Sequence, residues 1–113
     1  MIDASQRDSN DVVVTSTTDT VTLTVKKLEP EVATAIILIL QEFRNATKKH
    51  PVWPKCNIKR AALVAEEAGE LIREANQLDE DKGSLLHLKM EAIQTASTAL
   101  RMVTVLGEGG GNV

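Results

Sequence analysis

One helical stretch that carries an acidic stripe beside an apolar stripe constrains this chain more than any other feature. Over residues 57–78 the apolar side chains recur at the spacing of an α-helix. The apolar stripe consists of Val64, Ala68, Leu71, Ala75 and Leu78. The neighbouring stripe carries the carboxylates of Glu66, Glu67, Glu70 and Glu74. Like charges three or four residues apart repel by roughly 0.2–0.5 kcal/mol per pair, so we expect a partner that offsets them.

The length and the scarcity of aromatic residues bound the fold. A chain of 113 residues forms one domain, or one domain with an appendage. Because Phe43 and Trp53 are the only Phe, Tyr or Trp residues, small aliphatic side chains must fill the core, which suits close-packed helices completed by a second subunit. We expect an all-α helical domain over residues 30–106. A polar arm and β-hairpin over residues 1–29 precede it, and a flexible glycine-rich tail over residues 107–113 follows it.

β-branched residues predict the hairpin. Residues 12–15 read Val-Val-Val-Thr, and residues 21–25 alternate apolar residues with threonine. The polar residues between the two runs can turn the chain. A threonine-rich arm without regular structure is the alternative. Because an isolated hairpin is marginal in water, we expect this one to pack on the helices or on another subunit.

Three helices are predicted after the hairpin, over residues 30–46, 57–78 and 85–106. A stripe of apolar residues predicts that the first is substantially buried: Val32, Ile36, Ile39, Leu40 and Phe43. A loop with two prolines separates the first helix from the second. Asn57 and Ser84 are the expected N-caps of the second and third helices.

The charge balance and the cysteine count narrow the function classes and the compartment. A net charge of −3, from 13 basic and 16 acidic residues, argues against a general nucleic-acid or membrane-surface binder. Basic residues do gather before the acidic helix, namely Lys48, Lys49, Lys55, Lys59 and Arg60. This cluster is too local for a duplex, but it can meet a small anion. The longest apolar run, residues 35–40, is too short to cross a membrane, and a single cysteine favours a cytoplasmic protein.

An acidic residue of the third helix can complete a metal site. If the second and third helices pack antiparallel, Glu67, Glu70 and Glu91 converge. A pocket of carboxylate oxygens prefers Mg²⁺ or Mn²⁺, and such an ion would offset the repulsion within the acidic stripe. The alternative is a solvated acidic face with cations nearby, namely Lys59, Arg73 and Lys89.

These residues also carry a family resemblance. Glu66-Glu67-Ala68-Gly69-Glu70, followed by Glu91-Ala92-Ile93-Gln94, resembles the E-E-x-x-E … E-x-x-D signature of the MazG-like all-α nucleoside triphosphate pyrophosphohydrolases. Trp53-Pro54-Lys55 and the residues from Glu91 to Arg101 are similar to small members of that family. The resemblance covers residues 32–106 and omits the hairpin. Acid-rich helices are common, so the specificity comes from the two motifs at helical phase together with the tryptophan loop.

The resemblance implies a helical bundle assembled into a homodimer or homotetramer. It implies magnesium-dependent cleavage of the α–β phosphoanhydride of (d)NTPs to a monophosphate and pyrophosphate, as in nucleotide-pool house-cleaning. By motif position Glu67, Glu70 and Glu91 are metal ligands. Glu66 is either a further acid of the metal site or a partner that orients water or a basic residue.

Gln94 departs from the signature, because it stands where the family pattern has Asp. The amide oxygen can still coordinate a metal, but it brings no charge and cannot act as a base. Weaker metal binding, contact through a metal-bound water, and drifted activity are the three interpretations.

The resemblance and the positions of four residues suggest how a nucleotide binds. Trp53 can stack on the nucleobase, or it can plug the helix ends as a hydrophobic side chain. Lys55, Lys59 and Arg101 can meet phosphates, although a salt bridge to a neighbouring glutamate is an equal alternative for Lys59. The competing functional hypothesis is a non-catalytic helical binding or assembly module with the same fold. A nucleic-acid-binding regulator is a third, and it predicts steeply salt-dependent binding.

Overall fold

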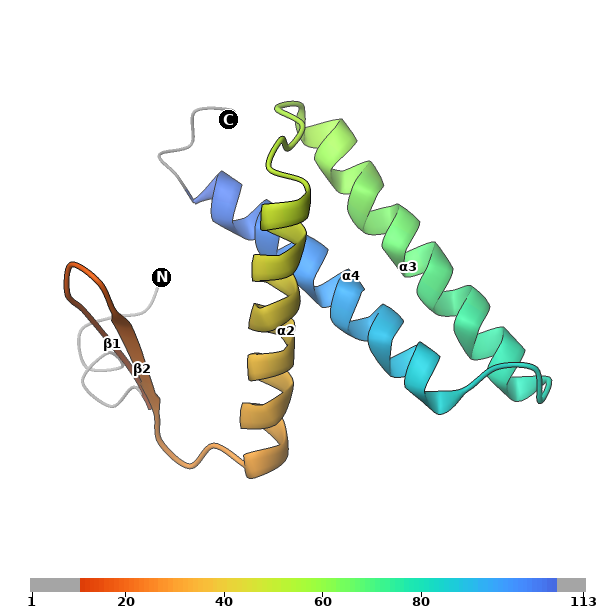
Figure 1. Ribbon diagram of the computed structural model, residues 1–113, viewed down its shortest axis with the longest axis horizontal. Helices are drawn as coiled ribbons and strands as arrows, with labels where there is room; N and C mark the ends of the chain where they lie inside the picture. The colour runs from red at the N-terminus through yellow and green to blue at the C-terminus, as the bar shows by residue number, and fades with distance from the viewer. Residues whose placement is uncertain (1–10, 108–113) are drawn as a thin grey trace. The chain divides into compact units, whose positions relative to one another are not determined.

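The computed structural model describes residues 11–107, which form one hairpin and three helices (Figure 1). The chain divides into two compact units, Met1–Thr34 and Ala35–Val113, and each is described by itself. The prediction of a mostly helical chain with an N-terminal hairpin is confirmed. The predicted arm over residues 1–10 and the end of the glycine-rich tail lie outside the described residues.

The hairpin pairs strand β1 (Val12–Ser16) with strand β2 (Val21–Val25) in antiparallel register, with Val14 opposite Leu23. Hydrogen bonds between Thr17 and Thr20 close the turn between the two strands. The Thr17 N–H donates to the Thr20 carbonyl oxygen at 2.7 Å, and the Thr20 N–H donates to Thr17 Oγ1 at 3.1 Å. The regular pairing rules out the alternative of an unstructured arm for these residues.

The register makes the hairpin amphipathic. Because opposite residues share a face and successive residues alternate, one face is nearly all aliphatic. That face carries Val12, Val14, Val21, Leu23 and Val25. The opposite face carries Val13, Thr15, Thr22 and Thr24. On the aliphatic face, Val14 is 62% and Val21 is 69% exposed, so the hairpin lacks the packed face that a two-stranded sheet needs in water.

The three helices begin where the sequence predicts. They are α2 (Pro30–Lys49), α3 (Asn57–Asp79) and α4 (Leu85–Leu106), and α2 extends past its predicted end at residue 46. Glu31 lies in the first turn of α2, and Lys48 and Lys49 lie in its last turn, which suits the helix dipole.

One of the two predicted N-caps is confirmed and the other is wrong. The Ser84 side chain accepts a hydrogen bond from the His87 N–H at 3.0 Å and so caps α4. For α3 the N-cap is Cys56, with extended backbone and no side-chain capping bond. Asn57 is already helical, and its Oδ1 accepts from Arg60 Nη1 at 2.9 Å instead.

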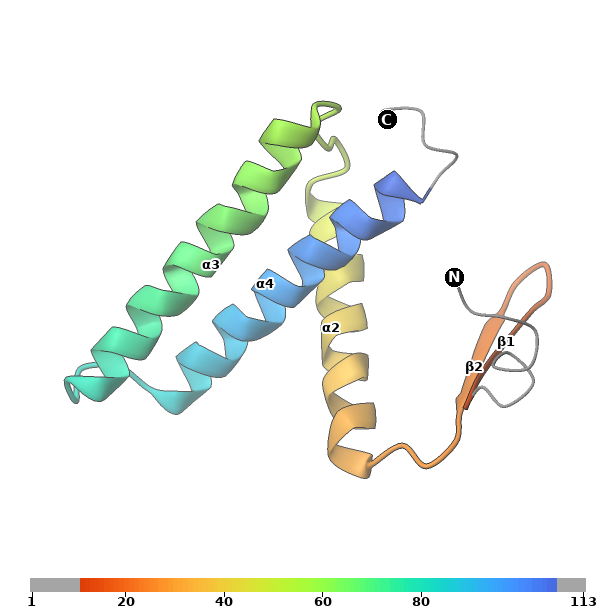
Figure 2. The same ribbon diagram turned by 180° about the vertical axis from the view of Figure 1, so that it is seen from behind.

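Helices α3 and α4 lie side by side and antiparallel, as both views show (Figures 1 and 2). The connection is tight because Asp81 adopts a φ of 60° and the Lys82 N–H donates to the Gln77 carbonyl oxygen at 2.8 Å. At Gly83 a Cβ atom would lie 2.9 Å from the backbone nitrogen of Leu78. Only glycine fits there without a backbone shift, and this turn brings α4 back along α3.

The described residues contain no buried hydrophobic side chain, and the prediction that the first helix is substantially buried is wrong. In α2, Val32 is 42% and Leu40 is 46% exposed, because the described part of one chain leaves their apolar stripe uncovered. Between α3 and α4 runs an open apolar groove lined by Ala61, Val64, Ala65, Ala68, Ala99, Met102, Val103 and Leu106. Over residues 11–107, none of the helices combines the length and apolarity required to cross a membrane.

Candidate functional site

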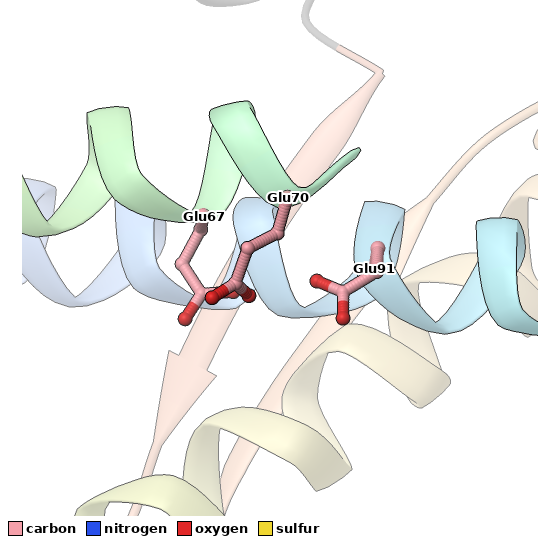
Figure 3. A group of neighbouring side chains, drawn as sticks. All are labelled: Glu67, Glu70 and Glu91. Carbon is pink, nitrogen blue, oxygen red and sulfur yellow. The ribbon is translucent and has the colours of Figure 1, made fainter. Parts of the chain in front are cut away.

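Three carboxylates meet where α3 faces α4. Glu67 and Glu70 come from successive turns of α3 and Glu91 comes from α4, and the three side chains extend toward a shared region (Figure 3). One oxygen from each lies within 4.8 Å of the other two. The antiparallel pairing of the two helices thus brings together the three glutamates that the sequence singles out as metal ligands.

The three carboxylates are partly buried and lie among like charges. Burial, followed by the charges of Glu70 and Glu91, raises the pKa of Glu67 above its ordinary value. Burial, followed by the charges of Glu70 and Glu74, raises the pKa of Glu91. Each of these raised pKa values means that burial and the neighbouring carboxylates disfavour the ionised form.

Two oxygen atoms of the cluster have no hydrogen-bond partner. The Oε2 atoms of Glu67 and Glu91 are buried and accept no hydrogen bond. The charge of Arg73 acts in the opposite direction and lowers the pKa of Glu91, but it does not outweigh burial and the neighbouring carboxylates. A buried carboxylate oxygen without a partner is costly, and a bound cation would balance it.

The donor set fits a hard divalent cation. All three side chains offer oxygen, they carry negative charge when ionised, and two of them have an unpartnered oxygen. Mg²⁺ and Mn²⁺ prefer this chemistry, whereas softer metals prefer sulfur or imidazole ligands. Glu67, Glu70 and Glu91 are thus the residues that would hold such an ion.

Glu66 and Glu74 flank the cluster differently. Glu66 is exposed and does not belong to the group of converging carboxylates. Glu74 is half-buried, and its Oε2 atom is buried without a hydrogen-bond partner. Its charge is one of the causes of the raised pKa of Glu91, so Glu74 belongs to the surroundings of the site.

Two cavities adjoin the carboxylates, and both include Glu67 in their walls. The first, of about 320 Å³, is mainly apolar, and its walls include Phe43, Trp53 and Leu63. Its volume lies at the small end of the roughly 300–1,000 Å³ typical of small-molecule sites. A flat ring with a polar edge suits such a cavity, because Ser97 and Glu67 add polar groups to it.

The second cavity, of about 450 Å³, is mainly polar. Gln94 and Glu67 line it from α4 and α3, so the glutamine at the departing signature position faces the same space as a predicted metal ligand. From α2 it receives Glu42, Asn45 and Lys49.

The sequence analysis missed the contribution of α2 to this second cavity. Positions 42, 45, 46 and 49 follow the i, i+3, i+4, i+7 spacing of one helix face, which was the available signal. The sequence indicated Lys49 only as one member of the basic cluster that precedes the acidic helix. It is the one lysine among the residues that line the described cavities.

The four predicted substrate-binding residues occupy different positions. Trp53 lines the apolar cavity, whereas Lys55 and Lys59 are exposed and line neither cavity. Arg101 is 8% exposed; its Nη2 donates to the His50 carbonyl oxygen at 2.8 Å, and its guanidinium lies 4.6 Å from the centre of the Trp53 ring. Burial lowers the pKa of Arg101, although an arginine stays charged at neutral pH.

Comparison with known proteins gave no match to a protein-family model, a curated protein sequence or a solved structure. The carboxylate cluster and the two cavities therefore carry the functional argument.

Proposed function

We propose that this protein is a magnesium-dependent nucleotide pyrophosphohydrolase of the MazG-like kind. The convergence of Glu67, Glu70 and Glu91 within 4.8 Å, with an unpartnered oxygen on Glu67 and on Glu91, is the observation that supports the proposal most. Mn²⁺ is the alternative ion, since both metals prefer oxygen ligands. The resemblance of the acidic motifs to the family signature supplies the reaction class.

In the proposed reaction one water is consumed, the α–β phosphoanhydride bond of a (d)NTP breaks, and a monophosphate and pyrophosphate are released. Bound at the three carboxylates, Mg²⁺ would supply positive charge to the phosphate oxygens. Glu67, Glu70 and Glu91 hold and orient that charge. A carboxylate within reach of the attacking water would accept its proton.

The two cavities suit the two ends of a nucleotide. The nucleobase occupies the apolar cavity against Trp53, where its flat face finds an aromatic wall. The phosphates occupy the polar cavity, where Lys49 supplies a cation and Glu67 borders the metal site. Glu67 lies in the walls of both cavities, so the scissile bond would lie beside the carboxylates.

Self-association belongs to the same proposal. The helices leave an apolar groove and many aliphatic side chains uncovered, so a second copy of the chain would supply the missing core. A homodimer or homotetramer in the cytoplasm that removes unwanted nucleotides from the pool is the role that the family resemblance favours.

The decisive assay is release of pyrophosphate from a panel of ribo- and deoxyribonucleoside triphosphates, with and without Mg²⁺. We expect turnover by the unmodified protein and loss of at least roughly 100-fold in Glu67→Ala and Glu70→Ala, because each removes a metal ligand. Glu80→Ala is the matched control, since Glu80 is exposed and follows α3 away from the cluster.

A different outcome supports the competing function. Absence of turnover on every nucleotide, together with absence of metal binding by calorimetry, would leave a non-catalytic binding or assembly module. Steeply salt-dependent binding to DNA or RNA would instead support the regulator hypothesis.

A further inference from the structure

Two arginines are buried in a chain whose described residues bury no hydrophobic side chain. Arg60 is 3% and Arg101 is 8% exposed. Both point at the loop between α2 and α3, which contains Pro51, Trp53 and Pro54. Burying a charged side chain is costly unless its hydrogen-bond donors are satisfied. The groups that these donors bind therefore indicate the role of each arginine.

The two arginines hold opposite ends of this loop. At its start, Arg101 Nη2 donates to the His50 carbonyl oxygen at 2.8 Å. At its end, Arg60 Nε donates to the Pro54 carbonyl oxygen at 2.6 Å, and Arg60 Nη1 donates to Asn57 Oδ1 at 2.9 Å. The prolines lack N–H groups, so the loop has fewer donors of its own to pair with these carbonyl oxygens. The arginines supply the missing donors.

Arg101 makes one contact that Arg60 does not. Its guanidinium lies 4.6 Å from the centre of the Trp53 ring, within the range of a cation–π interaction. Arg101 reaches the ring from α4, fifty-one residues away from His50 in the sequence. One side chain therefore fixes both the start of the loop and the indole ring, and it ties them to the helix that carries Glu91.

These contacts favour a positioning use of Arg101 over phosphate binding. Its Nη2 already donates to a backbone carbonyl oxygen, its Cζ atom lies over an aromatic ring, and it does not line the polar cavity that contains Lys49. Arg101 lies instead in the wall of the apolar cavity, together with Trp53 and Glu67.

We propose that Arg101 is a positioning residue that holds Trp53 as the wall of the apolar cavity, so that the cavity is preformed for a planar heterocyclic base beside Glu67. The proposal rests on the proposed function for the identity of the ligand, but the holding of Trp53 does not. Preforming the wall lowers the ordering cost of binding, so loss of Arg101 weakens binding of the base and leaves the carboxylate chemistry in place.

Trp53 is the only tryptophan, so its fluorescence reports the position of this ring directly. In Arg101→Gln we expect stronger quenching of Trp53 by acrylamide and a shifted emission maximum, because the ring is released. Arg44→Gln makes the same chemical change at an exposed position of α2 and should leave both unchanged. Arg101→Met, which keeps the apolar stem, replaces the Gln variant if far-ultraviolet circular dichroism shows that the latter does not fold.

Binding and turnover separate positioning from catalysis. A non-hydrolysable (d)NTP analogue should bind Arg101→Gln about three- to tenfold more weakly, and KM should rise by a similar factor with kcat nearly unchanged. Arg101→Lys, which keeps a cation but loses the planar fork, should recover part of the affinity.

Two results would overturn the proposal. The first is a folded Arg101→Gln or Arg101→Met variant in which the quenching of Trp53 equals that of the unmodified protein. The second is a kcat that falls while KM is unchanged, which would make Arg101 a catalytic residue. If no nucleotide is hydrolysed, the proposed function fails, but the quenching comparison still decides whether Arg101 holds Trp53.

Discussion

Glu66 and Glu67 are neighbours in the sequence and differ in where their side chains lie. Helical phase alone could place Glu67, Glu70 and Glu91 on facing helix surfaces, and the structure brings those three together. Helical phase does not determine whether Glu66 joins this cluster, because a residue at the edge of a stripe is buried or exposed according to how the neighbouring helix packs. Glu66 is exposed.

The contacts of Arg101 could not be predicted from the sequence either. A basic residue on a helix with acidic partners nearby is compatible with phosphate binding, and its contacts with His50 and Trp53 depend on how a loop fifty-one residues away folds back. Such a long-range contact leaves no periodic signal in the sequence.

The raised pKa values of Glu67 and Glu91 predict a pH dependence of stability. Their folded pKa values lie above the ordinary 4.5, so the folded state binds more protons than the unfolded state in that range. Their contribution to stability is therefore fully present below pH 4.5 and is lost as the pH rises through the folded pKa values. Without metal, we expect these two groups to raise the melting temperature as the pH falls from about 7 towards about 5.

Differential scanning fluorimetry with and without Mg²⁺ checks this expectation. Glu67→Gln removes one of the two titrating groups and should flatten the pH dependence. Because the metal binds the ionised carboxylates, stabilisation by Mg²⁺ should weaken over the same fall in pH. An identical pH dependence in the unmodified protein and in Glu67→Gln would contradict the assignment.

At the scale of elements, the apolar patterns of the sequence predicted all three helices and both strands of the described chain. Helix α4 matches its predicted bounds, and Ser84 caps it as expected. The N-cap prediction for α3 was wrong for a local reason. The Asn57 side chain accepts a hydrogen bond from Arg60, and Cys56 is the N-cap residue. The face of α2 that lines the polar cavity was not predicted, because the apolar stripe is the stronger periodic signal in that helix.

The connection between α3 and α4 predicts contrasting effects of two glycine substitutions. Gly83→Ala should destabilise the protein by at least about 1 kcal/mol, because its Cβ would lie 2.9 Å from the Leu78 backbone nitrogen. Gly69→Ala should stabilise it by roughly 0.5–1 kcal/mol, since nothing lies within 4 Å of the added Cβ and alanine favours the helix.

Urea unfolding monitored by circular dichroism measures both effects. Gly69→Ala also controls for the general effect of replacing glycine by alanine. Equal changes in the two variants, or a stabilised Gly83→Ala, would mean that the turn is not as tight as the structure has it.

At the scale of the whole molecule, the composition predicts a chain that buries little of its own apolar surface. Few aromatic residues and many small aliphatic ones suggested a core completed between subunits, and the described residues bury no hydrophobic side chain. A sequence gives the apolar stripes but not which of them a single chain covers. For that reason α2 was expected to be buried and is not.

The apolar groove between α3 and α4 predicts that assembly depends on Val103, which is 66% exposed and lines the groove. Analytical ultracentrifugation should find a dimer or tetramer for the unmodified protein. Val103→Glu should shift it towards monomer and lower its melting temperature, because a charge would be placed in the interface.

Thr104→Glu is the matched control for this substitution. It adds the same charge at the next residue of α4, which is exposed and lies outside the groove. A stable monomer of the unmodified protein, or an oligomer that tolerates Val103→Glu as well as Thr104→Glu, would contradict assembly through this groove.

The claim on which the account rests is that Glu67, Glu70 and Glu91 bind one divalent cation. Calorimetric titration with Mn²⁺ tests it without any assumption about the substrate. We predict one ion bound per chain, an affinity at least about tenfold weaker in Glu70→Gln, and little change in Glu66→Gln, whose side chain is exposed and lies outside the cluster. Absence of binding by the unmodified protein, or equal binding by Glu70→Gln, would contradict the account.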